Sequence, residues 1–362
     1  MKALIAMSGG VDSSVAAKLM VEQGFTCIGC TMKLYENEDA GVCNSRTCCS
    51  LDDVEDARSV AYKLGMPYYV FNFKADFREK VIRKFVKSYE NGITPNPCID
   101  CNRYMKFEKL YERARILDCD YVVTGHYARI EKSGERFLLK KALDETKDQS
   151  YVLYSMTQEQ LAHSLFPLGN LKKTETRKLA EEKGFVNADK PDSQDICFVP
   201  DGDYAKIIEL HTGKPSVPGD FVDKTGKILG KHRGIIHYTI GQRKGLGLSF
   251  QEPMYVCGIC PEKNTVLLGK QEELFQNIVY VKNFHWILGE TPKESFRCKA
   301  KIRYRQQEQW ALVTPLGDSV TKIEFDEKQR AITPGQAAVL YDGDVVLGGG
   351  EIAGGLENIH PV

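Results

Sequence analysis

The sequence lacks both a net charge and a long hydrophobic run. Its 362 residues include 49 Lys and Arg and 49 Asp and Glu, which excludes a uniformly basic nucleic-acid coat and an acidic tail. No stretch approaches the roughly 18 apolar residues that a membrane span needs. The apolar opening, residues 1–7, is too short for a secretion signal. We therefore expect a cytoplasmic enzyme without a membrane partner.

With no export signal, the twelve cysteines are expected to be reduced thiols rather than structural disulfides. Two C-x-x-C pairs lie in apolar, strand-like runs, where cysteine is usually a small buried hydrophobe, and we interpret them as structural: Cys27/Cys30 and Cys257/Cys260. Three others lie in a polar segment before a helix, where a loop is favoured over a metal site: Cys43, Cys48 and Cys49.

Strand-like and helix-like segments alternate over residues 1–200. The strand-like runs are 2–7, 26–32, 68–72 and 120–124, and the helical patterns are 12–23, 51–64, 75–90 and 104–117. This alternation predicts βαβ units and an α/β catalytic domain with a Rossmann-type parallel sheet. Such sheets bind ligands beyond the carboxyl ends of their strands.

The pattern changes after residue 200. Residues 201–275 hold one helix candidate, 204–211, followed by short runs punctuated by Gly and Pro. Turn signals then separate short strands at 278–281, 296–305, 310–314, 319–325, 337–341 and 345–352. The sequence predicts a small central domain over 201–275 and a β-barrel over 276–362.

The first strand and the first helix are joined by Ser8-Gly9-Gly10-Val11-Asp12-Ser13-Ser14. Paired glycines let the backbone turn tightly and approach a phosphate closely. The N–H groups of the first helical turn then hold the anion. The lysine of a Walker-type loop is missing, which excludes that class of NTPase.

This segment resembles the PP-loop, S-G-G-x-D-S, of the ATP pyrophosphatase superfamily, whose members release pyrophosphate by adenylating a substrate oxygen. The resemblance implies ATP, accompanied by Mg²⁺, over the loop. The implied nucleotide-binding residues are Ala6, Met7, Ser8, Gly9, Gly10, Val11, Asp12 and Ser13, flanked by Met32 and Gly125 at the ends of two other strands.

Two cysteines stand in polar surroundings. Cys101 lies in a proline-stiffened loop that leads into helix 104–117, and a thiol at a helix N-terminus has a lowered pKa that makes it a usable nucleophile. Cys197 lies in the polar loop 192–198, where the residues alone favour a reactive thiol and an inert one equally.

Further motifs follow the PP-loop in order: Pro95-Asn96-Pro97 with Cys101-Asn102, Thr124-Gly125-His126-Tyr127, Lys147-Asp148-Gln149-Ser150-Tyr151, Ser193 with Ile196-Cys197-Phe198, Thr239–Gly247, and Arg303-Tyr304-Arg305. Together they are similar, over essentially the whole chain, to the family of tRNA-specific 2-thiouridylases. The resemblance implies ATP-dependent thiolation of the 2-position of wobble uridine U34 in lysine, glutamate and glutamine tRNAs, with AMP and pyrophosphate released.

The same resemblance implies roles for individual residues. Cys197 would carry a persulfide, supplied by a cysteine desulfurase or a sulfur-relay protein, and Cys101 would be the nucleophile that releases its sulfur, leaving a Cys101–Cys197 disulfide. A uracil C2 oxygen is a poor leaving group, so adenylation must precede sulfur attack, and thiol exchange must follow it. The implied contacts with the target base and the tRNA are Asn96, Pro97, Cys98, His126, Lys147, Asp148, Gln149, Arg303, Tyr304 and Gln336.

One residue departs from the family pattern, because Cys98 stands where many members have Asp. The change creates three thiols, on Cys98, Cys101 and Cys197, that could hold a [4Fe-4S] cluster with one open iron. Thiolation through such a cluster is the alternative mechanism. No other metal site is predicted.

Two basic segments are candidate tRNA surfaces. Residues 224–251 contain six Lys or Arg and no acid, and five cations alternate through Arg297–Arg305. A strand would align those five on one face, which favours a polyanion such as an anticodon stem-loop whose wobble base is flipped into the cleft. Two rival functions stay open: another PP-loop synthetase, forming an amide or argininosuccinate, and a tRNA-binding protein with a vestigial nucleotide site.

Overall fold

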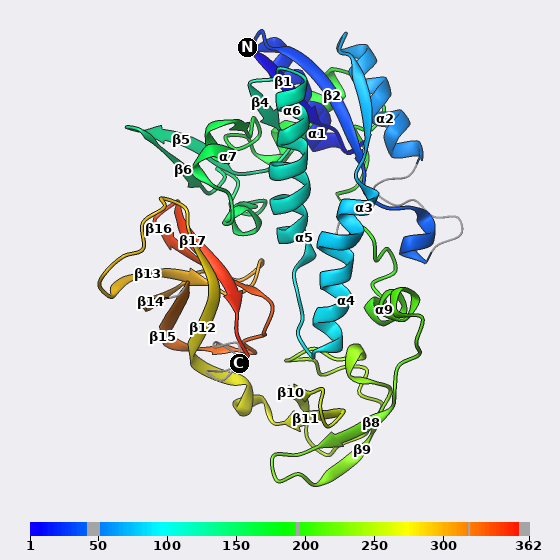
Figure 1. Ribbon diagram of the computed structural model, residues 1–362, viewed down its shortest axis with the longest axis vertical. Helices are drawn as coiled ribbons and strands as arrows, with labels where there is room; N and C mark the ends of the chain where they lie inside the picture. The colour runs from blue at the N-terminus through cyan, green and yellow to red at the C-terminus, as the bar shows by residue number, and fades with distance from the viewer. Residues whose placement is uncertain (42–50, 193–195, 318, 355–362) are drawn as a thin grey trace.

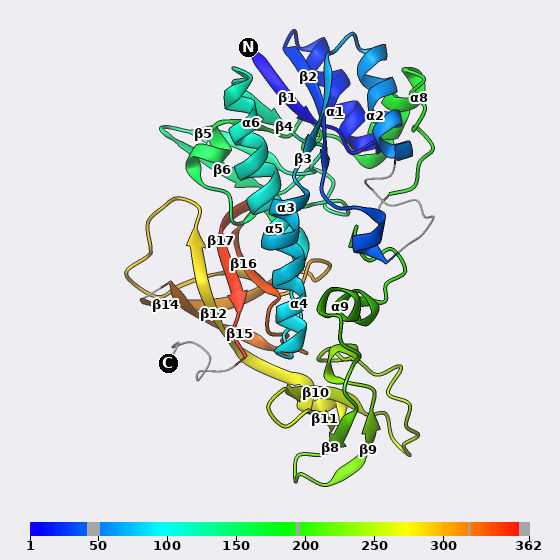
Figure 2. The same ribbon diagram turned by 45° about the vertical axis from the view of Figure 1, so that its right-hand side comes forward.

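A computed structural model gives the fold, and it describes residues 1–41, 51–192, 196–317 and 319–354. Figures 1 and 2 show a parallel-sheet region at one end of the long axis, a small β-rich region at the other end, and a barrel beside the long helices between them. The predicted loop that holds Cys43, Cys48 and Cys49 lies outside the described residues. No helix within the described ranges is long and apolar enough to cross a membrane.

The catalytic domain predicted from the sequence contains a five-stranded parallel sheet. Its strand order is β3 (Tyr68–Asn72), β2 (Thr26–Lys33), β1 (Lys2–Ala6), β4 (Tyr121–Val123) and β7 (Ser164–Leu165). The central strand β1 is apolar after its first residue, Lys2, because helices cover both faces of the sheet. The parallel α/β architecture is confirmed, and the carboxyl end of β1 opens into the predicted phosphate loop.

Alternate residues of β1 feed two separate cores. Ala3 and Ile5 pack with α1 (Val11–Glu22), α2 (Leu51–Lys63) and α8 (Lys173–Glu182) on one face. The opposite face carries Leu4, which packs with the two long helices and with α9 (Tyr204–Thr212). The two-residue period of a strand therefore determines which helices lie on each side of the loop.

Each of the two long helices contains a π-helical stretch. The first runs through α3 (Lys74–Phe77), η2 (Arg78–Ile82) and α4 (Arg83–Glu90), and the second through α5 (Pro97–Asp100), η3 (Cys101–Lys109) and α6 (Leu110–Ile116). The predicted start of the second helix at residue 104 is wrong, because it begins at Pro97. Asn96 caps it by accepting a hydrogen bond from the Cys98 amide (3.2 Å), and proline is well suited to the first helical position. Cys98 and Cys101 therefore lie on the helix and not in a loop before it.

The central region is a four-stranded sheet in the order β10 (Tyr255–Cys260), β11 (Thr265–Gly269), β8 (Gly219–Val222) and β9 (Ile228–His232). Phe221 is at the centre of its own small core. The remaining short helices are η1 (Asn37–Ala40), η4 (Ser150–Leu153), α7 (Gln158–Ala162), η5 (Ile235–His237) and η6 (Gln271–Leu274).

The C-terminal region is a closed six-stranded barrel, as predicted. The strands follow the order β12 (Phe275–Trp286), β15 (Val320–Arg330), β14 (Gln309–Gly317), β13 (Phe296–Lys301), β16 (Ala337–Asp342) and β17 (Val345–Ile352), and β12 pairs with β17 to close it. A hairpin from the N-terminal part of the chain, β5 (Arg129–Ser133) and β6 (Arg136–Lys140), extends the sheet beside β17. The Tyr151 hydroxyl donates to the Ala337 carbonyl (2.8 Å) in a core that the two regions share. The barrel is thus fixed directly to the catalytic domain.

The predicted ladder of five cations does not form. Strand β13 ends at Lys301, and the chain then turns, so Arg303 and Arg305 leave the strand face. Arg303 donates to the Ala331 carbonyl (2.7 Å), and Arg297 forms an ion pair with Asp326 (2.5 Å). Only part of this segment is left to contact a polyanion.

Candidate functional site

The phosphate loop joins β1 to α1 through a conformation that requires glycine at position 9. Gly9 has φ of +76°, and a Cβ there would lie 2.4 Å from the Asp53 carbonyl oxygen. Gly10 is the N-cap of α1, and no side chain caps the helix there. The N–H groups of the first turn are therefore not claimed by a side-chain cap, which suits them to bind an anion. The Ser13 hydroxyl stabilises the turn by donating to the Gly10 carbonyl (3.0 Å).

Residues 187–192, which we call the strap, lie against this loop. Asn187 donates to the Gly9 carbonyl and to the Ser14 hydroxyl, both at 2.9 Å. Lys190 contacts the same carbonyl (3.4 Å) and forms ion pairs with carboxylates of α2. The loop is thus held from both sides, which keeps its N–H groups in a fixed direction.

Asp12 is the only acidic residue in the first turn of α1, and its charge is compensated. The Lys173 ammonium lies 2.7 and 2.8 Å from its two oxygens, and the Tyr127 hydroxyl donates to it (2.9 Å). Gly125, after β4, allows close approach to the same turn, because a Cβ there would lie 2.8 Å from the Ser13 nitrogen. This turn is therefore packed on several elements.

A cavity of about 380 Å³ opens beside the loop, and we call it the thiol cavity. Cys101 and Cys197, which are far apart in sequence, both line it. The chain at Cys197 is fixed by the Tyr35 hydroxyl, which donates to its carbonyl (2.5 Å), and by the buried Phe198 ring packed edge-on against Phe77. The predicted site residues that line this cavity are Ala6, Met7, Ser8, Asp12, Ser13, Met32, Pro97, Cys98, Cys101, Gly125, His126, Gln149 and Cys197.

The lowered pKa predicted for Cys101 is wrong for this structure. Burial raises the pKa of its thiol, the Lys106 ammonium opposes that rise, and the Asp100 carboxylate adds to it. The desolvation penalty on the thiolate exceeds the stabilisation from Lys106, which Asp100 partly cancels. The structural interpretation of Cys27 and Cys30 agrees with their burial, which raises the pKa of both thiols.

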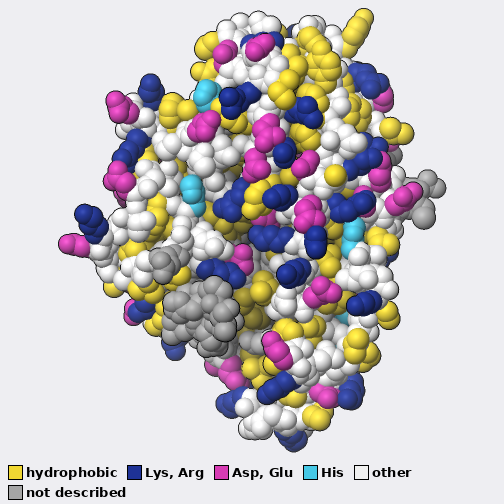
Figure 3. All heavy atoms as spheres, viewed as in Figure 1, with side chains coloured by type: hydrophobic (Ala, Val, Ile, Leu, Met, Phe, Trp, Pro, Cys, Tyr) yellow, Lys and Arg dark blue, Asp and Glu magenta, His cyan; other side chains and the backbone are white. Residues whose placement is uncertain are grey.

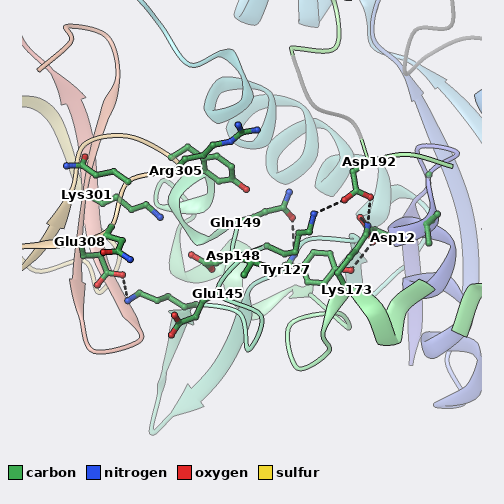
Figure 4. A pocket seen from close by; sticks show the side chains of 18 of the residues that line it. Asp12, Tyr127, Glu145, Asp148, Gln149, Lys173, Asp192, Lys301, Arg305 and Glu308 are labelled. Carbon is green, nitrogen blue, oxygen red and sulfur yellow. Dashed lines mark hydrogen bonds and ion pairs between the residues drawn. The ribbon is translucent and has the colours of Figure 1, made fainter. Parts of the chain in front are cut away.

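A larger cavity of about 840 Å³ separates the catalytic domain from the barrel, and we call it the basic cleft. Figure 4 shows Lys301, Arg305 and Glu308 on the barrel side, facing Asp12 and Lys173. Of the described residues that line it, seven are Lys or Arg and five are Asp or Glu: Lys141, Lys147, Lys173, Lys190, Lys299, Lys301 and Arg305, against Asp12, Glu145, Asp148, Asp192 and Glu308. The excess of positive charge is local, since the face drawn in Figure 3 mixes both signs.

The two cavities meet. Ser8, Asp12 and Gln149 line both of them, so the phosphate loop is reached from the basic cleft as well as from the thiol cavity. A large anionic ligand in the cleft would therefore have one of its parts next to the two cysteines.

Comparison with known proteins adds a family to this geometry. Residues 1–201 match the model described as tRNA methyl transferase HUP domain, 207–270 the tRNA methyl transferase PRC-barrel domain, and 276–352 the aminomethyltransferase beta-barrel domain. The chain is 52% identical to the tRNA-specific 2-thiouridylase MnmA of Clostridioides difficile, over 97% of this chain and 98% of that one. It is 51% identical to the protein of the same name from Acetivibrio thermocellus, over 97% and 99%.

The chain belongs to the MnmA family. Four of the residues predicted to contact tRNA, from two segments of the chain, line the basic cleft: Lys147, Asp148, Gln149 and Tyr304. The Lys147 ammonium forms an ion pair with Asp192 (2.8 Å), and Gln149 accepts a hydrogen bond from the Tyr127 amide (3.0 Å). Asp148 accepts from the Ala142 amide and from Ser150, so its carboxylate holds the local chain, and Tyr304 lines the cleft from the barrel.

The other residues predicted to contact tRNA are dispersed. Asn96 and Gln336 line a third cavity of about 400 Å³, where Gln336 donates to the Thr94 carbonyl (2.9 Å). Arg303 is committed to the barrel turn, and none of residues 224–251 lines the basic cleft. His126 is only 6% exposed and lines the thiol cavity.

The three thiols of the cluster alternative are all described. In the described ranges, no group of three or more His, Cys, Asp and Glu side chains is arranged to hold a metal ion. The exposed Cys98 and the half-buried Cys101 and Cys197 all line the thiol cavity, but they are not grouped to hold a single metal ion, and no step below is routed through a cluster.

Several residues of the site were not predicted from the sequence. Lys173 had a readable signal, since a cation at the start of a helix opposes the helix dipole and needs a reason to be there. Asp192 forms ion pairs with Lys147, Lys173 and Arg177 at 2.8–2.9 Å. Asn187 donates to the Gly9 carbonyl of the phosphate loop. No local pattern marks these two, because their partners are distant in sequence.

Proposed function

We propose that the protein thiolates the 2-position of wobble uridine in lysine, glutamate and glutamine tRNAs. The observation that carries the proposal is that Cys101 and Cys197 line the same cavity as the phosphate loop. The curated relatives are named tRNA-specific 2-thiouridylases, whereas the description of the family model names methyl transfer. Two thiols facing a nucleotide loop favour thiolation, since methyl transfer needs neither.

ATP supplies an adenylyl group that converts the uridine C2 oxygen into a leaving group, with pyrophosphate released. The residues of the loop bind and orient the nucleotide: the N–H groups after Gly10 hold phosphate, and Lys173 keeps Asp12 neutralised beside it. Mg²⁺ is proposed as the counter-ion of ATP. Since the described side chains supply no group of three ligands, the phosphates and water would provide most of its coordination.

The tRNA would bind in the basic cleft through its phosphates. The cleft lies between Lys147 on the catalytic domain and Lys301 on the barrel, and it joins the thiol cavity at Gln149. RNA bases are recognised when they are unstacked and turned out of the strand. A wobble base entering at this junction brings its C2 next to the cysteines.

Sulfur transfer then proceeds in two balanced steps. The terminal sulfur of a Cys197 persulfide attacks C2, AMP departs with the former C2 oxygen, and the sulfur loses its proton. The Cys101 thiolate next attacks Sγ of Cys197, the bond to the terminal sulfur breaks, and its electron pair completes the C2 thiocarbonyl. The products are 2-thiouridine and a Cys101–Cys197 disulfide, which a dithiol reductant must reduce. A cysteine desulfurase or sulfur-relay protein is the proposed source of the persulfide.

The test uses tRNA, ATP, Mg²⁺ and a sulfur donor, with mass spectrometry of the wobble nucleoside and assay of pyrophosphate. We expect 2-thiouridine with the wild type, none with Cys101→Ala or Cys197→Ala, and normal yield with the control Cys260→Ala in the central sheet. Thiolation in either active-site variant would contradict the two-thiol mechanism. Pyrophosphate release without tRNA thiolation would favour an amide- or argininosuccinate-forming synthetase, and absence of both would favour a vestigial nucleotide site.

A further inference from the structure

The thiol cavity contains one cation to which the proposed mechanism gives no role. Lys106 is the only lysine or arginine among the described residues that line this cavity, and Asp12 is the only carboxylate. Asp12 is already paired with Lys173. The half-buried Lys106 is therefore the one cation of this lining, and no carboxylate of the lining compensates its charge.

The π-helical stretch η3 explains why Lys106 faces the cavity. In an α-helix, residues five apart lie about 140° from one another around the axis. In a π-helix the hydrogen bonds run from residue i to i+5, so residues five apart lie on the same face of the helix. Cys101 begins this stretch and Lys106 is five residues later, which brings both side chains to one face.

His126 holds the Lys106 ammonium in place. The lysine nitrogen lies 3.3 Å from His126 Nε2, and the Thr124 hydroxyl lies 2.7 Å from Nδ1. An ammonium can only donate, so Nε2 must accept, and the ring is neutral with its proton on Nδ1, donated to Thr124. Burial first, and the nearby Lys106 second, hold the pKa of His126 well below its usual value. The ring is packed against Phe107 and Phe166 and cannot swing away freely.

We propose that Lys106 is a positioning residue that stabilises the Cys101 thiolate, and that neutral His126 keeps it oriented for this task. The inference rests on the proposed function only for the use of that thiolate, which attacks Cys197 Sγ after its proton has passed to solvent. Burial opposes ionisation of Cys101, and Lys106 is the one neighbour that counteracts it. The other titratable side chains that line the cavity are Cys98 on the same helix, Asp12 on α1, His126 after β4, and Cys197. Asp100 lies outside this lining, where it pairs with Lys84 (2.9 Å), and its carboxylate also acts on the Cys101 thiol.

The test is alkylation of Cys101 by iodoacetamide, followed at the peptide level over a pH series, without ATP, tRNA or sulfur donor. Lys106→Met should slow the reaction about tenfold near neutral pH and raise its midpoint by about one pH unit. Lys106→Arg should stay within about threefold of the wild type, since the charge is kept. The matched control is Lys109→Met, on the same helix but paired with Glu112 (3.1 Å), and it should change nothing. The exposed Cys98 serves as an internal reference in every variant.

An unchanged Cys101 profile in Lys106→Met would overturn the inference, and a raised KM for ATP with that unchanged profile would assign Lys106 to the nucleotide instead. If Cys101 reacts too slowly in every variant, the pH profile of single-turnover 2-thiouridine release decides, with Lys106→Arg restoring what Lys106→Met loses. Alkylation that shifts as expected in a protein unable to thiolate tRNA would refute the proposed function and leave the inference standing.

Discussion

The phosphate loop allows a sharp test through the substitution Gly9→Ala. Gly9 has φ of +76°, and an added Cβ would meet the Asp53 carbonyl oxygen at 2.4 Å and its Cα at 2.8 Å. These are backbone atoms of α2, so no flexible side chain can move aside. The loop itself must shift away from α2, and its N–H groups must move with it.

The magnitude has two parts. A left-handed conformation costs a residue with a Cβ about 1–2 kcal/mol, and overpacking against atoms that cannot yield costs about 1–3 kcal/mol more. If the loop recovers its shape only when ATP binds, the whole penalty falls on binding. A loss of about 3 kcal/mol corresponds to roughly a hundredfold weaker Kd.

The assay is calorimetric titration with ATP beside thermal unfolding. The control is Gly134→Ala in the β5–β6 turn, where φ is +61° and no atom lies within 4 Å of the added Cβ. That variant should lose about 1–2 kcal/mol of unfolding free energy and keep its Kd for ATP. The reasoning would be refuted if Gly9→Ala bound ATP within about threefold of the wild type.

Three other changes separate the parts of the account. Cys98→Ser should keep the thiolation rate within about threefold of the wild type, because a two-thiol mechanism does not use Cys98. Loss of activity in this variant, together with bound iron and sulfide in anaerobically purified wild type, would favour the cluster alternative. Burial tends to raise the pKa of Asp192, but hydrogen bonds from its lysine partners outweigh it and hold the pKa at about 2. Since this pKa is depressed in the folded state, the ionised Asp192 stabilises the fold above about pH 4, and this stabilisation disappears as the pH falls toward 2. Asp192→Asn should therefore lower the free energy of unfolding by about 2 kcal/mol at pH 7, measured with denaturant, and should not change it at the acid end. A difference independent of pH would contradict this. Asn187→Ala, which removes the donor to Gly9, should lower the unfolding free energy by about 1–3 kcal/mol, and an unchanged unfolding midpoint would show that the strap does not support the loop.

The parts of the fold that depend on local pattern were predictable. The first strand and the first helix lie within a residue or so of their expected bounds, because an apolar run and a pair of glycines each act over a few residues. The start of the second long helix was missed although Asn96 and Pro97 are a readable cap, since the prolines were interpreted only as stiffening a loop. The end of β13 at Lys301 could not be read from alternation alone, because the cations continue past it.

The site was predictable in its membership and not in its electrostatics. The family resemblance, and not the spacing of the cysteines, predicted that Cys101 and Cys197 belong to the site, and both line the thiol cavity. The pKa of Cys101 was expected in the wrong direction because burial depends on segments distant in sequence. The proposed role of Lys106 depends on the π-helical stretch η3, which no sequence pattern predicted.

The central claim is that Cys197 delivers its persulfide sulfur to the uridine and that Cys101 releases this sulfur by forming a disulfide with Cys197. The most direct measurement is peptide mass spectrometry under non-reducing conditions after a single turnover with persulfide-loaded protein, ATP and tRNA. We expect a Cys101–Cys197 disulfide in an amount equal to the 2-thiouridine formed. Equal 2-thiouridine with Cys101 and Cys197 left unlinked would contradict it.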